Sequence, residues 1–298
     1  MINSRHALAS LLLAPIICLQ AQAQESPPLE EELVLEEVIV TASRRVEKLQ
    51  EVAMSVSAFT SDFFADAGVN QLSGLDQYTP NLNITPGTDS RSTSIRIRGI
   101  GSVGTNTGID PSVGLFLDGV YQGRAGMSIG DLVDVERVEV LRGPQGTLYG
   151  KNTAAGAISV ITKLPTTDFE SLLEFNYDTN ELGELRGMVN VPFGNSPHAM
   201  RLSGWYADGD HLYDNTVTGD GVNDVNKWGG RARVLFDLAG QTANERLGQF
   251  ILTVDYSKEE TDCCALAVMD YNGLSTLNSL YSYSHYVDLQ EFMLVFCV

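Results

Sequence analysis

The most constraining feature of this sequence is an alternation of polar and apolar residues that persists through its second half without any long apolar run. No stretch of about 18 or more apolar residues offers a membrane-spanning helix. Beyond Leu164-Pro165 the hydrophobic period is two, which indicates strands with one apolar face. If the chain crosses a membrane, it must therefore do so with strands. The clearest alternating stretches are 200–206, 228–237 and 250–257, with less regular candidates at 169–177 and 184–193.

The length and connections of these stretches favour a transmembrane sheet. Each stretch is close to the length that a tilted strand needs to cross a bilayer. The connection at 194–197 is short and the one at 208–226 is long, an asymmetry typical of the two ends of a transmembrane β-barrel. An ordinary soluble β-sandwich shares the alternation and stays open as an alternative. In the stretch 200–206 the two faces consist of Met200, Leu202 and Tyr206 on one side and Arg201, Ser203 and Trp205 on the other.

The number of strands is too small for a complete barrel around a second domain. Residues 166–298 supply about six or seven strands at the observed spacing. A closed barrel of about eight strands has an interior just wide enough for side chains. The chain also ends in Phe-Met-Leu-Val-Phe-Cys-Val at 292–298, without the terminal aromatic residue expected of a last barrel strand. We therefore expect a fragment, or the product of a premature stop or frameshift, whose open strand edges favour aggregation.

The N-terminus has the pattern of a secretory signal peptide. Arg5 precedes an apolar run from Ala7 to Leu19, and Ala21-Gln22-Ala23 provides a cleavage site, so we expect residues 1–23 to be removed. Residues 24–51 then form a flexible leader, acidic at its start. Cleavage leaves Cys263, Cys264 and Cys297, an odd number that makes no disulfide framework. The net charge of −19 argues against a nucleic-acid partner.

A short β-prone segment lies within the leader. It consists of Glu37-Val38-Ile39-Val40-Thr41-Ala42. Its backbone groups are suited to pairing with the sheet edge of another chain. It can equally be the first strand of the domain that follows, and the residues do not separate these two interpretations.

Residues 52–165 predict a small, glycine-rich α+β domain. Val52 to Phe59 alternates like a strand, and Thr60 is placed to cap a short helix that Gly68 would end. A second short helix is expected at 72–78, before Pro80. Further strands are expected at 94–98, 113–117, 135–141 and 157–162, with Asp118-Gly119 as a tight hairpin turn.

No arrangement of residues predicts catalysis, a cofactor or a metal site. The glycines of 99–104 match a dinucleotide fingerprint, but a loop follows where a helix is required. Residues 146–152 depart from a phosphate-binding loop in glycine spacing, and Asn152 replaces the Ser or Thr that would hold magnesium. The acidic stretch 208–224 lacks the spacing of a calcium loop, and the histidines are scattered.

A stretch late in the α+β domain carries a family resemblance. Residues 135–150 read Val-Glu-Arg-Val-Glu-Val-Leu-Arg-Gly-Pro-Gln-Gly-Thr-Leu-Tyr-Gly, and with 152–162 they resemble the end of the plug domain of TonB-dependent receptors of the Gram-negative outer membrane. Residues 95–99 and 116–121 match earlier strands of that plug, and 37–42 is similar to the TonB box. The resemblance covers residues 36–260.

The resemblance implies a fold and a function. The fold is an α+β plug domain, residues 52–165, followed by antiparallel transmembrane β-barrel strands of an incomplete barrel, residues 166–298. In this family a plug sits inside a barrel of about 22 strands, and periplasmic TonB transmits force to it from the inner-membrane proton gradient. The implied function is active uptake of a scarce substrate, most often an iron-siderophore complex, and no enzymatic activity. The alternative is a truncated, plug-containing periplasmic binding protein without transport activity.

The resemblance also implies site residues. TonB would bind by strand addition at the segment from Glu37 to Ala42, through Glu37, Val38, Ile39, Val40, Thr41 and Ala42. Arg98 and Arg142 of the plug would pair with glutamates on later barrel strands. The substrate would contact two plug loops, 102–110 and 122–128, with Ser102, Asn106, Asp110, Gln122 and Arg124 as the candidate residues.

Partners and location follow from the same resemblance. The expected partners are TonB, a siderophore or other small ligand, and the outer membrane with its assembly machinery; no cofactor is expected. A complete protein would lie in the cell outer membrane as a multi-pass β-barrel, whereas a truncated one would be periplasmic or degraded. Because residues 24–36 are too few for an extra N-terminal signalling domain, we expect uptake without transcriptional signalling.

Overall fold

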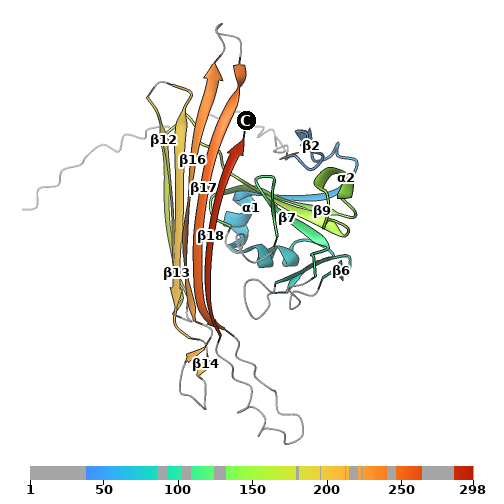
Figure 1. Ribbon diagram of the computed structural model, residues 1–298, viewed down its shortest axis with the longest axis vertical. Helices are drawn as coiled ribbons and strands as arrows, with labels where there is room; N and C mark the ends of the chain where they lie inside the picture. The colour runs from blue at the N-terminus through green and yellow to red at the C-terminus, as the bar shows by residue number, and fades with distance from the viewer. Residues whose placement is uncertain are drawn as a thin grey trace, which may run out of the picture. The chain divides into compact units, whose positions relative to one another are not determined.

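The computed structural model describes residues 38–85, 93–102, 109–123, 132–178, 181–194, 196–211, 213–214, 221–222, 224–239, 246–263 and 285–297. The expected signal peptide, the start of the leader, Glu37, Asn106, Arg124 and Cys264 lie outside these residues. Residues Glu37–Val298 form one compact unit. It contains a set of short strands and helices, up to β10, and from β11 onward a set of longer strands with one small hairpin, β14-β15, between them (Figure 1).

The first set is an α+β domain with a five-stranded sheet at its centre. The strand order is β3-β9-β10-β7-β8, in which β10 and β7 run parallel and the other pairs are antiparallel. These strands are β3 (Ser55–Thr60), β7 (Val113–Leu117), β8 (Val120–Gln122), β9 (Val135–Arg142) and β10 (Gly156–Thr162). A three-stranded sheet of β4 (Leu82–Thr85), β5 (Ser94–Ile97) and β6 (Ile100–Gly101) packs in the same domain. The predicted strands are confirmed.

The central sheet is buried on both faces. On β9, Val138 and Val140 belong to a large apolar cluster that includes the helices and the three-stranded sheet. Leu141 points to the opposite face of the sheet, into a smaller apolar cluster that also contains Phe116 and Val40 of strand β1. Because successive side chains of a strand alternate between faces, a strand covered on both sides reads as a continuous apolar run. The sequence of β7, Val-Gly-Leu-Phe-Leu, is such a run.

The helices are short, and two of them differ from expectation. Helix α1 (Ser61–Ala67) begins as predicted, because the Thr60 hydroxyl oxygen accepts a hydrogen bond from the Phe63 amide, and it ends at Gly68, which has a φ of 64°. The second helix, η1 (Leu72–Gln77), is a 3₁₀ helix, whose i to i+3 repeat places Leu72 and Leu75 together in the core. A one-turn helix, α2 (Gly146–Tyr149), was not predicted. In the described part of the chain no helix is long and apolar enough to cross a membrane.

The second set is a six-stranded antiparallel sheet in the order β11-β12-β13-β16-β17-β18. The predicted strands are confirmed, but they run further than expected because Asp208 on β13 still pairs with Asn226 on β16. The long connection between them also contains a small hairpin, β14-β15. The bounds are β11 (Glu170–Tyr177), β12 (Gly183–Pro192), β13 (Ala199–Gly209), β14 (Tyr213–Asp214), β15 (Gly221–Val222), β16 (Val225–Ala239), β17 (Arg246–Cys263) and β18 (His285–Cys297).

The six-stranded sheet has its apolar side chains outside and its polar side chains inside. Leu173 is 75% exposed and Phe175 is 69% exposed, whereas Arg201 is 2% exposed and Arg233 is 3% exposed. A soluble β-sandwich buries the apolar face instead, so this alternative does not fit the structure. The inverted pattern is that of a strand with one face toward lipid and one toward the interior of a barrel.

Candidate functional site

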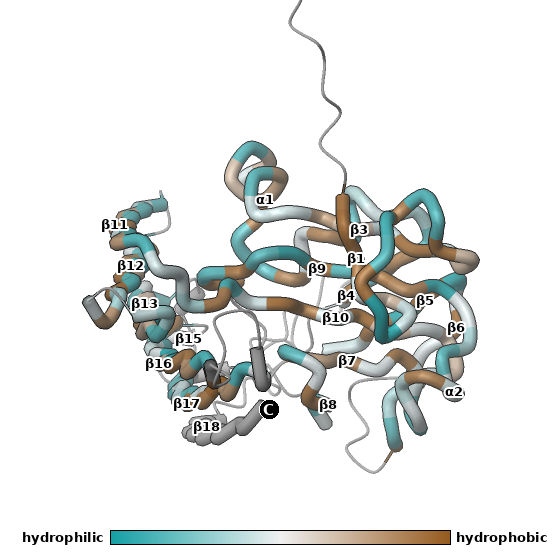
Figure 2. The backbone as a smooth tube through the Cα atoms, turned by 90° about the horizontal axis from the view of Figure 1, so that it is seen from above, coloured by the Kyte–Doolittle hydropathy of each residue, from teal (hydrophilic) through white to brown (hydrophobic). Residues whose placement is uncertain are grey.

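The segment 38–42, which is the described part of the predicted TonB box, is held against the α+β domain. Strand β1 (Ile39–Val40) pairs with β2 (Glu47–Lys48), and the Leu49 amide donates to the Val38 carbonyl at 2.9 Å. The Val40 and Ala42 side chains are fully buried, while Ile39 is 51% exposed. Figure 2 shows β1 as a hydrophobic segment. The sequence left two interpretations open for this segment, pairing with another chain or the first strand of the domain that follows. In the structure the strand is paired within its own chain.

A buried carboxylate contacts the middle of this segment. One oxygen of Glu139, on β9, accepts hydrogen bonds from the Thr41 amide at 2.7 Å and from the Thr41 hydroxyl at 3.2 Å. The same oxygen accepts from Arg137 Nε at 2.8 Å, and Arg137 also donates to the Thr41 hydroxyl. Glu139 is completely buried. Thr41 is thus bound to a charged pair in the domain interior.

The turn after the segment carries a second contact. The Arg44 guanidinium lies over the Tyr149 ring, 4.6 Å from its centroid, a cation–π geometry. The Tyr149 ring in turn packs edge-on against Phe116 at 4.9 Å. Burial raises the pKa of the Tyr149 hydroxyl, with a further contribution from the negative charge of Glu139 that Arg44 partly offsets. The segment and its turn are therefore held at two neighbouring places.

Arg201 on β13 ties the α+β domain to the six-stranded sheet. Its guanidinium makes two hydrogen bonds to the carboxylate of Asp134, both at 2.7 Å, and a third to Glu170 at 3.0 Å. The Arg201 and Asp134 side chains are 2% and 7% exposed, whereas Glu170 is 41% exposed. A bidentate pair of this kind is among the strongest polar contacts in proteins.

A second arginine of the sheet makes a parallel connection. Arg233 on β16 forms an ion pair with Asp118 and donates to the carbonyls of Thr162 at 3.1 Å and Lys163 at 3.2 Å. The Asp118 carboxylate also accepts from the Thr162 amide and hydroxyl, both at 2.9 Å. The hairpin turn of β7-β8 and the end of β10 are therefore fixed to the sheet at one point.

The two predicted plug arginines lie elsewhere. Arg142 donates to the Ser57 hydroxyl at 3.1 Å, and Arg98 sits in the turn after β5 with a φ of 53°. Neither makes an ion pair with another described residue, and Arg142 Nε is buried without a partner among them. Their pairing with barrel glutamates stays a prediction.

Of the predicted substrate residues, the structure describes Ser102, Asp110 and Gln122. The Ser102 carbonyl accepts from the Ser94 hydroxyl at 2.7 Å, and Asp110 is exposed. Gln122 ends β8 and donates to the Val120 carbonyl at 3.4 Å. Asn106 and Arg124 lie outside the described residues.

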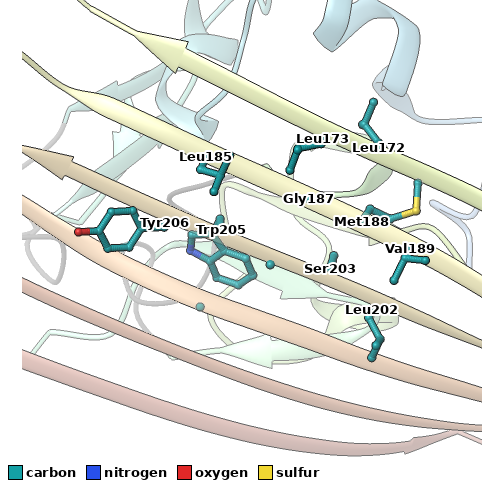
Figure 3. A pocket seen from close by; sticks show the side chains of 12 residues that line it. Leu172, Leu173, Leu185, Gly187, Met188, Val189, Leu202, Ser203, Trp205 and Tyr206 are labelled. Carbon is teal, nitrogen blue, oxygen red and sulfur yellow. The ribbon is translucent and has the colours of Figure 1, made fainter.

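An apolar groove crosses the six-stranded sheet where two glycines pair. Gly187 on β12 lies opposite Gly204 on β13, and the groove beside them has a volume of about 610 Å³. Figure 3 shows Leu173, Leu185 and Leu202 among its lining side chains. The lining carries no charged side chain, and its polar side-chain atoms are those of Ser203, Trp205 and Tyr206.

Sequence reasoning missed the residues that hold the parts together. The alternation of β13 identifies Arg201 only as a member of the polar strand face, and the Asp118-Gly119 pair identifies Asp118 only as a turn residue. A signal was present, because charged residues on the inner face of a membrane strand need partners. The identity of those partners, Asp134 and Asp118, depends on tertiary contacts that strand alternation does not encode.

Comparison with known proteins agrees with this arrangement. The family model described as the TonB-dependent receptor plug domain matches residues 48–157. The pesticin receptor of Yersinia enterocolitica is 34% identical over 169 residues, which are 56% of this chain and 23% of the relative. The vitamin B12 transporter BtuB of Vibrio vulnificus is 28% identical over 207 residues, which are 68% of this chain and 31% of the relative.

Two solved structures share the fold. The ferric yersiniabactin uptake receptor FyuA from Yersinia pestis superimposes with a TM-score of 0.62 at 23% identity, over 70% of this chain and 32% of its own. The pyoverdine outer membrane receptor FpvA from Pseudomonas aeruginosa PAO1 gives a TM-score of 0.61 at 21% identity, over 75% of this chain and 30% of its own. The chain spans less than a third of the length of each of these four proteins.

The structure combines an α+β domain with an antiparallel sheet whose apolar side chains are exposed, and ion pairs join the two. This combination defines the class of protein as a plug domain with strands of a transmembrane barrel. The chain contains the plug domain of the TonB-dependent receptors and has the fold of the outer-membrane receptors of that family. This is a family of receptors and transporters rather than enzymes. The six strands cover part of a barrel and do not close in the described residues.

Proposed function

We propose that this chain provides the plug and barrel strands of a receptor that actively imports an iron-siderophore complex. The observation that carries the proposal is the attachment of the plug to the sheet by the buried pair of Arg201 and Asp134. A plug fixed to the barrel wall blocks the lumen, so passage of a substrate requires work on the plug. Two of the structural relatives are receptors for ferric yersiniabactin and for pyoverdine, which supports a ferric chelate as the substrate.

We further propose that TonB binds the segment from Glu37 to Ala42 by strand addition. Strand β1 contains two residues and pairs with a strand of two residues. Exchange of this short pairing for a longer one with another chain loses few hydrogen bonds and gains several. The plug arginines Arg98 and Arg142 are proposed to pair with glutamates on barrel strands other than the six described. The Nε atom of Arg142, which is buried and has no hydrogen-bond partner among the described residues, supports this role.

We also keep the plug loops as the proposed substrate contacts, through Ser102, Asn106, Asp110, Gln122 and Arg124. The support comes from the three described members, which lie in loops or at strand ends of the plug: Asp110 is exposed, and Ser102 and Gln122 are partly buried.

The test is uptake of radioactive iron as a siderophore complex in cells that express the gene encoding this chain. We expect uptake that stops when the proton gradient is collapsed. An Ile39→Pro variant should lose uptake but keep siderophore binding, because proline cannot donate a ladder hydrogen bond. Ile39→Val is the matched control.

A second measurement distinguishes the proposed outer-membrane importer from the alternative, a truncated periplasmic binding protein. The receptor should be found in outer membranes and should change electrophoretic mobility on heating, as folded barrels do. A soluble periplasmic product that binds ligand and supports no uptake would establish the alternative.

A further inference from the structure

We propose that Glu139 is the positioning residue that holds the segment 38–42 on the plug and thereby sets how readily TonB reaches it. The inference rests on the proposed function, since it concerns access to the proposed TonB-binding segment. It is carried by contacts of Glu139 that the strand pairing of β1 does not require. Glu139 lies on β9 in the domain centre, 98 residues from Thr41 along the sequence.

The geometry makes Glu139 the main polar attachment of the segment. Its Oε1 atom accepts both donors of Thr41, the amide at 2.7 Å and the hydroxyl at 3.2 Å. Arg137 contacts both of these residues, because it donates to the same Glu139 oxygen and to the Thr41 hydroxyl. A hydrogen bond to a charged group is stronger than one between neutral groups.

Complete burial strengthens this attachment. Glu139 is 0% exposed, so its charge is stabilised by Thr41 and Arg137 rather than by water. Departure of Thr41 removes two of the three donors at Oε1. The carboxylate therefore opposes release until water replaces those donors.

The other carboxylate oxygen makes the attachment reversible. Glu139 Oε2 is buried and has no hydrogen-bond partner among the described residues. When the segment leaves, the space of the buried Val40 and Ala42 side chains opens, and water reaches both oxygens. Hydration of Oε2 then offsets part of the free energy lost with the hydrogen bonds at Oε1. Release of the segment by a partner strand therefore costs less free energy than the hydrogen bonds of the closed state alone indicate.

Release has a direct chemical readout in the following turn. Arg44 stacks on Tyr149, and its amide donates to the Thr41 carbonyl at 2.9 Å. Loss of the Thr41 contacts frees this turn, and the peptide bonds after Arg44 and Arg45 become substrates for trypsin. The rate of cleavage at these bonds reports local opening when closing is fast.

The experiment measures trypsin cleavage after Arg44 and Arg45 in the purified receptor, with fragments identified by mass. Glu139→Leu removes the acceptor while Arg137 keeps its ion pair with Glu136, and we expect cleavage to be faster by about tenfold or more. Glu139→Gln keeps an oxygen for the Thr41 amide and should lie between. Glu136→Gln is the matched control, because Glu136 pairs with Arg137 on the same strand without contacting Thr41, and it should cleave at the wild-type rate.

The outcomes separate this inference from the proposed function. A Glu139→Leu rate equal to wild type, or an equal acceleration by Glu136→Gln, overturns the role of Glu139. Simultaneous cleavage at Arg142 in the Glu139→Leu variant would show that the whole plug has loosened. In that case the Glu139→Gln variant decides: a wild-type rate of cleavage after Arg44 and Arg45 overturns the role of Glu139. Binding of the periplasmic domain of TonB is measured in parallel. Accelerated cleavage without tighter binding supports the role of Glu139 in holding the segment 38–42 but contradicts TonB recognition at this segment.

Discussion

Arg201 and Arg233 lie directly opposite each other on the neighbouring strands β13 and β16. Two like charges at this position destabilise a strand pair. Each arginine is neutralised by an aspartate of the plug, Arg201 by Asp134 and Arg233 by Asp118. The pairing of these two strands therefore depends on the plug, which is a structural element of the six-stranded sheet.

The first prediction concerns the bidentate pair. Asp134→Asn should destabilise the attachment of the plug by about 3–5 kcal/mol, because it leaves the buried Arg201 charge without its main partner. Glu170→Gln removes the other, more exposed partner of the same arginine and should cost about 0–1 kcal/mol. Equilibrium unfolding in lipid vesicles measures both. Equal effects of the two substitutions would contradict the assigned roles.

The sequence predicted the elements well and their connections poorly. Alternation placed β13, β16 and β17, because one period-two pattern fixes both strand type and face. Helix η1 was expected as an ordinary helix, since Leu72 and Leu75 fit either repeat and the burial of both selected the tighter one. The attachment of Thr41 to Glu139 joins residues 98 positions apart, and such a contact has no local sequence signal.

The second prediction tests packing in the plug core. A Cβ atom at Gly156 would lie 2.4 Å from the Leu141 carbonyl oxygen and 2.7 Å from Ile97 Cδ1. Because the first neighbour is backbone of β9, Gly156→Ala should destabilise the plug by about 1–3 kcal/mol. Gly146→Ala, where a Cβ meets nothing within 4 Å, is the control and should be neutral or slightly stabilising. Denaturant midpoints of the two variants provide the comparison, and a neutral Gly156→Ala would show that β9 is free to shift.

The third prediction is a pH dependence at Tyr149. Burial and the charge of Glu139 raise the pKa of Tyr149 above its ordinary value of 10.0. The fold therefore favours the protonated phenol, so the contribution of this group is fully present below about pH 10 and is lost as the pH rises through the raised value. Relative to Tyr149→Phe, the wild type should lose stability above about pH 10. Thermal unfolding at pH 9 and pH 11 measures this difference, and identical profiles for the two proteins would refute it.

The fourth prediction distinguishes the two faces of the six-stranded sheet at adjacent residues of β11. Leu173 is 75% exposed on the apolar face, and Leu172 points to the opposite face, 52% exposed. Leu173→Arg should destabilise the membrane-inserted protein by about 2–4 kcal/mol, because a charge in the middle of a strand would face hydrocarbon. Leu172→Arg should cost less, since the inner face already holds Arg186 and Arg201. Urea unfolding in vesicles, with detergent-solubilised protein as a reference, gives both values; a larger penalty for Leu172→Arg would reverse the assignment of the faces.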